Sequence, residues 1–214
     1  YYSDLRRSYG REQPYGVKTW YVGNEMDGPW QIGNLTAEQY AQKALHAARM
    51  MRDVDPTIEL ALCGSCTPDS PTVMDWDRIV LEATYDVCDY LSIHSYYPYP
   101  GEAQRNDYLA SFRKMDDFIV QILAACDYVA AKRHSRRRMA LAFDEWAVQC
   151  ETRPRPEEHR YHPGLIDVLA VGGLWCTLLK HADRVKIGGQ TMLVNALSVL
   201  FTTEGGVLRS GYYD

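Results

Sequence analysis

Met139-Ala-Leu-Ala-Phe-Asp144 is the stretch that decides the fold, because it predicts a β-strand without polar alternation. Apolar side chains at successive positions are typical of a parallel strand that is buried on both faces. The stretch leads directly into Glu145, and a second run, 17–22, leads into Gly23-Asn-Glu25. Each of the two glutamates is therefore expected where a strand passes into a loop.

Strand and helix patterns alternate along the rest of the chain. Thr36-Ala-Glu-Gln39 forms a capping box, which predicts the start of a helix. Five strands separated by helices are typical of parallel βαβ units, and in an α/β barrel the strand-end residues gather at one rim. We therefore predict an α/β fold, a partial (β/α)8 TIM barrel. The predicted strands are 17–22, 58–63, 90–94, 139–144 and 185–187, and the predicted helices are 36–53, 75–83, 106–132, 165–181 and 193–201.

The composition is that of a globular protein and argues against two classes of partner. The 214 residues carry a formal net charge of −5, which does not favour binding to a polyanion such as nucleic acid. No run approaches the roughly 18 apolar residues of a membrane span, so no membrane partner is expected. Six cysteines are scattered through apolar patterns instead of forming a disulfide framework, and this favours a reducing cytoplasm.

The two glutamates point to one kind of chemistry if they meet across a pocket. Most glycosidases cleave the glycosidic bond with two carboxyl groups that face each other across the substrate. Glu25 lies among aromatic, glycine and amide residues in the segment 20–33. Two alternatives stay open from the residues alone: Glu25 is a surface residue after a strand, and Glu145 is ion-paired, with Arg184 as one candidate partner.

His94 and Tyr96 end a third predicted strand in Leu91-Ser-Ile-His-Ser-Tyr96. Residues spaced i and i+2 project from the same side of a strand. The pair is therefore expected to orient a carboxylate or to hold a sugar ring. The alternative is that His94 is merely hydrogen-bonded at a strand end.

The motifs together resemble a known family. The segment 17–33, Asp89–Tyr96, Phe143-Asp-Glu-Trp146 and the segment 181–195 are similar, in this order, to family 51 of the glycoside hydrolases, the α-L-arabinofuranosidases of clan A. The resemblance implies that residues 1–214 form the C-terminal portion of a TIM-barrel catalytic domain, with barrel strands four to eight. Barrel strands one to three and the C-terminal β-sandwich of the family are then absent.

The resemblance also implies roles for particular residues. Glu25 matches the acid/base of the family, and Glu145 matches its nucleophile. The sequence departs from the family after Trp146, where Ala147, Val148 and Gln149 stand in place of Asn, an apolar residue and a second Trp; this puts sugar stacking in doubt. The positions expected to contact substrate are Asn24, Trp30, His94, Tyr96, Trp146 and Gln190.

The expected activity is that of a retaining, exo-acting α-L-arabinofuranosidase that needs no cofactor and no metal. Its expected partner is an arabinose-containing oligosaccharide or polysaccharide, and the full-length protein is expected to be a homo-oligomer. One alternative is another clan A hydrolase, such as an endo-β-glycanase. A second alternative is an incomplete fragment that serves as an interaction module through exposed strand edges.

Two short motifs do not favour a metal or redox site. Cys63-Gly-Ser-Cys66 has the spacing of a redox motif but lacks a second cysteine pair. His159 and His162 lie close to two glutamates in a proline-rich segment that offers no further ligands.

Overall fold

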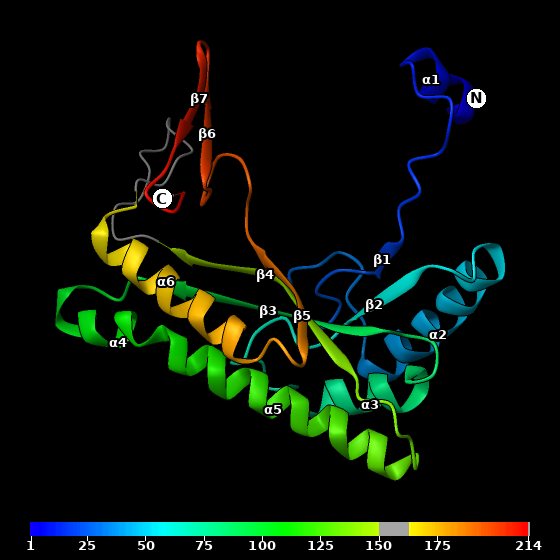
Figure 1. Cartoon of the computed structure of the whole chain (residues 1–214). Coiled ribbons are helices and arrows are strands. Elements are labelled where there is room, and N and C mark those ends of the chain that lie inside the picture. The colour runs from blue at the N-terminus through cyan, green and yellow to red at the C-terminus, as the bar shows by residue number, and fades with distance from the viewer. Residues whose placement is uncertain (150–162, 214) are drawn as a thin grey trace.

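The computed structural model describes residues 1–149 and 163–213, and its centre is one parallel sheet. The strands follow the order β1-β2-β3-β4-β5, and neighbouring strands in this order pair in parallel (Figure 1). The strands of this sheet are β1 (Thr19–Val22), β2 (Glu59–Cys63), β3 (Tyr90–Pro98), β4 (Ala140–Gln149) and β5 (Val185–Gln190). The helices are α1 (Tyr2–Ser8), α2 (Ala37–Val54), α3 (Asp75–Thr84), the 3-10 helix η1 (Glu102–Gln104), α4 (Arg105–Leu109), α5 (Ser111–Lys132) and α6 (Leu165–Lys180).

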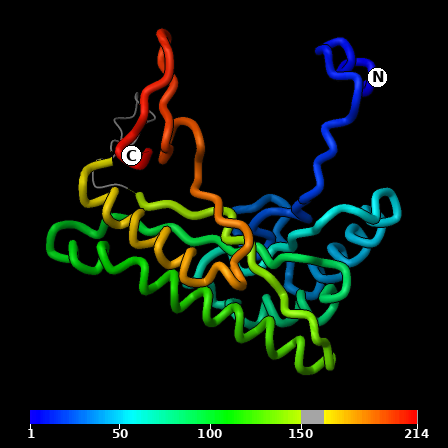
Figure 2. The backbone as a smooth tube through the Cα atoms, in the orientation of Figure 1, coloured from blue at the N-terminus to red at the C-terminus, as the bar shows by residue number. Residues whose placement is uncertain are grey.

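The long helices pack against one face of the sheet. α2, α3, α5 and α6 form a row in which each helix contacts the next, and Figure 1 shows them beneath the strands. α1 lies away from the sheet and buries none of its side chains (Figure 2). No helix in the described part of the chain is long and apolar enough to cross a membrane.

The prediction of a partial (β/α)8 TIM barrel is wrong. The five expected strands are present, but they curl into an open half-barrel in which β1 pairs only with β2 and β5 only with β4 among the described residues. After β5 the chain leaves the sheet and forms a separate antiparallel hairpin of β6 (Leu200–Thr203) and β7 (Gly206–Arg209) (Figure 1). The two edges of the sheet therefore do not meet.

The predicted helix over 193–201 is also wrong, because this segment leads into the hairpin. Asn195 and Ala196 have φ values of 63° and 49°, in the left-handed region that a right-handed helix cannot contain. The Asn195 side chain accepts a hydrogen bond from the Thr202 backbone N–H at 3.0 Å and holds the turn against β6. Apolar spacing suggested the helix, but local side-chain hydrogen bonding decided the turn.

The capping box at the start of α2 is confirmed and orients a residue that joins two strand ends. Thr36 accepts a hydrogen bond from the Gln39 backbone N–H, and the Gln39 side chain accepts one from Thr36. One turn on, the buried Tyr40 hydroxyl donates to the Val22 carbonyl at 2.6 Å and accepts from the Cys63 N–H at 2.8 Å. Tyr40 therefore bridges β1 and β2 where their ladder ends.

Gly64, the first residue after β2, provides a test of packing at the strand ends. Its N–H donates to the Ser92 carbonyl, and a Cβ at this position would lie 2.7 Å from that same oxygen and 2.8 Å from Asp77 Oδ1. Gly64→Ala is expected to lower the free energy of unfolding by about 1–3 kcal/mol, because the added carbon overlaps the Ser92 carbonyl oxygen and a carboxylate oxygen of Asp77. Urea denaturation measures this change.

Gly172→Ala is the matched control for Gly64→Ala. Gly172 lies within α6, and a Cβ there would meet nothing within 4 Å. Alanine in place of a helical glycine is expected to raise the free energy of unfolding by up to about 1 kcal/mol. Equal effects of the two substitutions would contradict the close packing at Gly64.

Candidate active site

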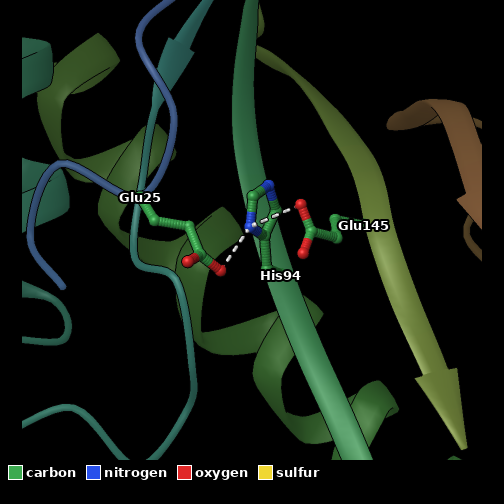
Figure 3. A group of neighbouring side chains, drawn as sticks. All are labelled: Glu25, His94 and Glu145. Atoms are coloured by element: carbon green, nitrogen blue, oxygen red, sulfur yellow. Dashed lines mark hydrogen bonds and ion pairs between the residues drawn. The ribbon is translucent and has the colours of Figure 1, made fainter. Parts of the chain in front are cut away.

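Glu25, His94 and Glu145 come from three segments that are far apart in the sequence, and their side chains point toward one another (Figure 3). Glu25 follows β1, His94 lies in β3 and Glu145 in β4. His94 Nδ1 lies 3.0 Å from Glu25 Oε1 and 3.7 Å from Glu145 Oε2. One oxygen of each glutamate and one nitrogen of His94 all lie within 4.8 Å of one another. The structure therefore brings the two glutamates together.

Glu25 is held by its backbone and by indole and amide donors. Its φ of 47° is in the left-handed region, which costs a non-glycine residue of order 1 kcal/mol and is found disproportionately at functional sites. Trp30 Nε1 donates to Glu25 Oε2 at 2.5 Å, and Gln31 Nε2 lies 3.5 Å from the same oxygen. The surface-residue alternative for Glu25 is excluded, since its side chain is only 11% exposed.

Glu145 receives its main hydrogen bond from Tyr96. The Tyr96 hydroxyl donates to Glu145 Oε1 at 2.5 Å. Burial, together with the hydrogen bond and charge of Glu145, raises the pKa of Tyr96 well above its usual value, so Tyr96 keeps its proton and acts as a donor. Arg184 does not pair with Glu145, because its guanidinium binds Asp127 at 2.8 Å.

Asp144 and Ser92 belong to the same cluster, although the sequence did not indicate them. Adjacent residues of a regular strand point to opposite faces, so Asp144 and Glu145 were not expected to meet the same partner. The pairing of β3 with β4 shifts between Ser92 and His94, and such a bulge turns neighbouring side chains toward one side. The Ser92 hydroxyl donates to Asp144 Oδ1 at 2.8 Å, and His94 Nε2 lies 3.7 Å from Asp144 Oδ2.

The pKa of His94 is raised to about 9. Burial alone would lower this pKa, but the carboxylates of Asp144, Glu25 and Glu145 stabilise the imidazolium more strongly. At neutral pH both ring nitrogens then carry protons, and Nδ1–H donates to Glu25. His94 therefore bridges the two glutamates as a cation.

This shift predicts how stability depends on pH. A histidine whose pKa is higher in the folded state than in the unfolded state stabilises the fold fully below the unfolded value of about 6.5. The contribution, on the order of 3 kcal/mol, is lost as the pH rises through about 9. We expect the free energy of unfolding, measured in urea between pH 6 and about 10, to fall across this window and to flatten in His94→Asn.

His46→Gln is the matched control for the pH experiment. His46 is exposed on α2, and its substitution should leave the pH dependence as it is in the unsubstituted protein. An unchanged slope in His94→Asn would contradict the assignment of this titration to His94.

The other predicted substrate-binding residues take different positions. Asn24 is exposed next to Glu25, and the Trp30 ring is 58% exposed beside the cluster, so both are accessible to a ligand. Trp146 is not in the cluster: it is fully buried, and its ring centroid lies 5.0 Å from that of Trp175 on α6. Gln190 ends β5 next to Trp146, and its buried Nε2 has no hydrogen-bond partner among the described residues.

The donor atoms of Glu25, His94 and Glu145 are also close enough to hold a cation. Because the pKa of His94 is about 9, a metal ion at neutral pH would have to displace the proton from the imidazole. Cys63 and Cys66 line a small hollow beside Glu25 and are both free thiols. The other weak metal candidates, His159 and His162, lie outside the described residues.

A scan against protein families matches part of this chain. Residues 144–214 match the α-L-arabinofuranosidase C-terminal domain. The match begins within β4 and therefore covers the end of the sheet as well as the hairpin. This finding also contradicts the assignment of the chain to a partial TIM barrel, since it attributes a third of the chain to a C-terminal domain.

Curated proteins with similar sequences are arabinofuranosidases. An intracellular exo-α-(1→5)-L-arabinofuranosidase 1 of Bacillus subtilis is 45% identical over 220 residues, covering 96% of this chain and 43% of that protein. An exo-α-(1→6)-L-arabinofuranosidase of Bifidobacterium longum is 38% identical over 224 residues, covering 95% and 42%. The chain thus spans less than half the length of these relatives.

Solved structures of related proteins have the same arrangement of elements. A family 51 α-L-arabinofuranosidase from Bifidobacterium longum superposes with a TM-score of 0.86 at 33% identity, covering 99% of this chain and 45% of that one. An α-L-arabinofuranosidase from Thermotoga maritima, in complex with arabinose, gives a TM-score of 0.81 at 32% identity, with coverage of 100% and 42%. The described fold is thus found within larger enzymes.

Proposed function

Because this chain belongs to family 51 of the glycoside hydrolases, we propose that it carries both catalytic glutamates of an exo-acting α-L-arabinofuranosidase that retains anomeric configuration. The observation that supports this most directly is the approach of Glu25 and Glu145 to within 4.8 Å, with His94 between them. Retaining glycosidases place their two carboxyl groups about 5–5.5 Å apart, whereas inverting enzymes leave about 6.5–9.5 Å for a water molecule. The activity is proposed for the whole protein that contains these residues.

In the first step Glu145 attacks the anomeric carbon of the arabinofuranosyl unit. A bond forms between a Glu145 oxygen and this carbon, and the bond from the carbon to the leaving oxygen breaks. Tyr96 donates to Glu145 Oε1 and leaves Oε2 on the side of His94 as the oxygen available for attack. The product of this step is a covalent glycosyl–enzyme.

Glu25 transfers the protons. In its acid form it protonates the leaving oxygen, so that the aglycone departs as a neutral alcohol. Of the two N–H groups that donate to Glu25 within 3.0 Å, His94 Nδ1–H is the one that can give up its proton, since the indole N–H of Trp30 does not ionise. In the second step Glu25 takes a proton from water, the water oxygen bonds to the anomeric carbon, and Glu145 is released as a carboxylate.

The names of the relatives support a substrate class and a location. They include enzymes named for α-(1→5) and α-(1→6) linkages, and the Bacillus subtilis protein is called intracellular. We propose that the substrates are terminal arabinofuranosyl residues of plant cell-wall polysaccharides or of their oligosaccharides. Hydrolysis of oligosaccharides would take place in the cytoplasm.

Hydrolysis of synthetic glycosides tests the proposal. The full-length protein is expected to cleave p-nitrophenyl α-L-arabinofuranoside, and proton NMR of early product should show α-L-arabinofuranose before mutarotation. Preferential cleavage of β-linked p-nitrophenyl glycosides would point to a clan A β-glycanase instead. Release of the β-anomer first would contradict retention, and absence of any hydrolysis would favour the interaction module.

A further inference from the structure

Asp27 lies two residues after Glu25 and reaches from that turn to the loop that follows β2, residues 64–66. Its carboxylate oxygen Oδ2 accepts a hydrogen bond from the Cys66 backbone N–H at 3.1 Å. The other oxygen, Oδ1, is buried and has no hydrogen-bond partner among the described residues. The Asp27 side chain therefore joins the Glu25 turn to a second loop through one oxygen.

The loop after β2 is itself fixed on two sides. On the side of β3, the Gly64 N–H donates to the Ser92 carbonyl at 2.7 Å, and the Ser65 carbonyl accepts from the His94 N–H at 3.4 Å. On the side of α3, the N–H and the hydroxyl of Ser65 donate to the fully buried Asp77 carboxylate at 2.9 and 2.6 Å. The loop is therefore a firm support for any group bound to it.

This chain of contacts leads from Glu25 to His94. Asp27 binds the loop, and the loop binds the backbone of β3 at His94. Glu25, Cys66 and His94 also line one small hollow. The side chains of Glu25 and His94 meet in that region at 3.0 Å (Figure 3). The position of the Glu25 turn relative to His94 thus depends on the bond between Asp27 and Cys66.

The surroundings of Asp27 suit a carboxyl group that serves as an acceptor. Burial raises the pKa of Asp27, the hydrogen bond from the Cys66 backbone lowers it, and the charge of Glu25 raises it. A protonated carboxyl group and a carboxylate both keep an oxygen that can accept from the Cys66 N–H. Asparagine also offers such an oxygen, whereas alanine leaves the buried N–H of Cys66 without this partner.

We propose that Asp27 is a positioning residue for Glu25: its bond to the loop after β2 keeps the Glu25 carboxyl group beside His94 and within reach of the leaving oxygen. The role rests on the proposed function, in which Glu25 protonates that oxygen. Asp27 acts through Glu25 and contacts no reacting atom. A displacement of about 1 Å at a reacting group can lower a rate about 10²-fold, so one lost hydrogen bond in the support has a measurable effect.

Two substrates distinguish positioning of Glu25 from a general structural role. In the full-length protein, Asp27→Ala is expected to slow the first step with an arabino-oligosaccharide about 10- to 100-fold, because its leaving oxygen needs the proton of Glu25. With 2,4-dinitrophenyl α-L-arabinofuranoside, whose phenolate leaves without a proton, the first step should slow by less than about threefold. Asp27→Asn keeps the acceptor for Cys66 and should restore the rate with the oligosaccharide.

The indole proton of Trp30 reports the position of Glu25 without turnover. Trp30 Nε1 donates to Glu25 Oε2 at 2.5 Å, and a short hydrogen bond moves the resonance of its proton downfield. The NMR signal is identified by its loss in Trp30→Phe. It should move upfield in Asp27→Ala and keep its position in Asp27→Asn.

Asp53→Ala, which alters an exposed aspartate of α2, is the matched control and should change neither the rates nor the Trp30 signal. Equal rate losses with the two substrates, an unmoved Trp30 signal in Asp27→Ala, or a defect in Asp27→Asn as large as in Asp27→Ala would overturn the role of Asp27. If the unsubstituted protein hydrolyses neither substrate, the proposed function fails, and the Trp30 signal still decides whether Asp27 positions Glu25.

Discussion

Glu145→Ala is expected to lower kcat/KM for p-nitrophenyl α-L-arabinofuranoside by about 10⁴- to 10⁶-fold in the full-length protein. Losses of this size are seen when the nucleophilic machinery of a hydrolase is removed. Without the carboxylate no glycosyl–enzyme can form, although Glu25 and His94 stay in place to protonate the leaving group. Initial rates measured with and without the substitution give the ratio.

Azide should restore part of the activity of Glu145→Ala and should change the product. Alanine leaves space beside His94 for a small anion, which can attack the anomeric carbon from the side that Glu145 occupied. A single displacement inverts the configuration, so the expected product is β-L-arabinofuranosyl azide, identified by NMR. Glu38→Ala, which alters an exposed glutamate of α2, is the matched control and should keep full activity. Rescue with retained configuration would remove Glu145 from its role.

Glu25→Gln is expected to produce a loss that depends on the leaving group. General acid catalysis contributes about 10²- to 10⁴-fold, and we expect this loss for an arabino-oligosaccharide, whose sugar alkoxide leaves poorly without a proton. For 2,4-dinitrophenyl α-L-arabinofuranoside the first step should be nearly unaffected, since the phenolate is stable unprotonated. The amide keeps the shape of the side chain, but its single oxygen accepts from Trp30 or from His94 and not from both.

Comparison of the two substrates distinguishes acid catalysis from positioning. Pre-steady-state measurement of dinitrophenolate release isolates the first step from the hydrolysis of the intermediate, which also uses Glu25. A burst of phenolate followed by slow turnover is the expected time course. An equal loss of first-step rate for both substrates would show that Glu25 acts on the arabinose and not on the leaving oxygen.

Several features of the fold followed from local sequence patterns. The capping box at Thr36 and the five strands were predictable because short-range hydrogen bonds and apolar periodicity are properties of a few neighbouring residues. The helix predicted over 193–201 failed for a related reason: its apolar spacing resembled a helix, while the hydrogen bonds from Asn195 to β6 link residues that periodicity does not relate. The prediction of a partial TIM barrel was based on a correct alternation of strands and helices, but the described strands form an open half-barrel and residues 144–214 match a C-terminal domain.

The candidate site was predictable in its main residues and not in their surroundings. Glu25, His94, Tyr96 and Glu145 were expected because the sequence patterns placed each of them at or near a strand end, and parallel strands bring such positions to one edge. In the structure only Glu25 follows its strand, whereas the other three lie within β3 and β4. Asp144 was missed because strand alternation places it on the face away from Glu145. Only the shifted pairing between β3 and β4 turns it toward His94.

The sequence by itself determined which residues are proposed as the reactive groups and the strand near which each lies, since both depend on residues that are close together in the chain. Tertiary structure alone decided that Glu25 and Glu145, 120 residues apart, approach within 4.8 Å. It also decided that His94 carries a proton between them, because the pKa of a buried imidazole depends on carboxylates that three separate strands bring together.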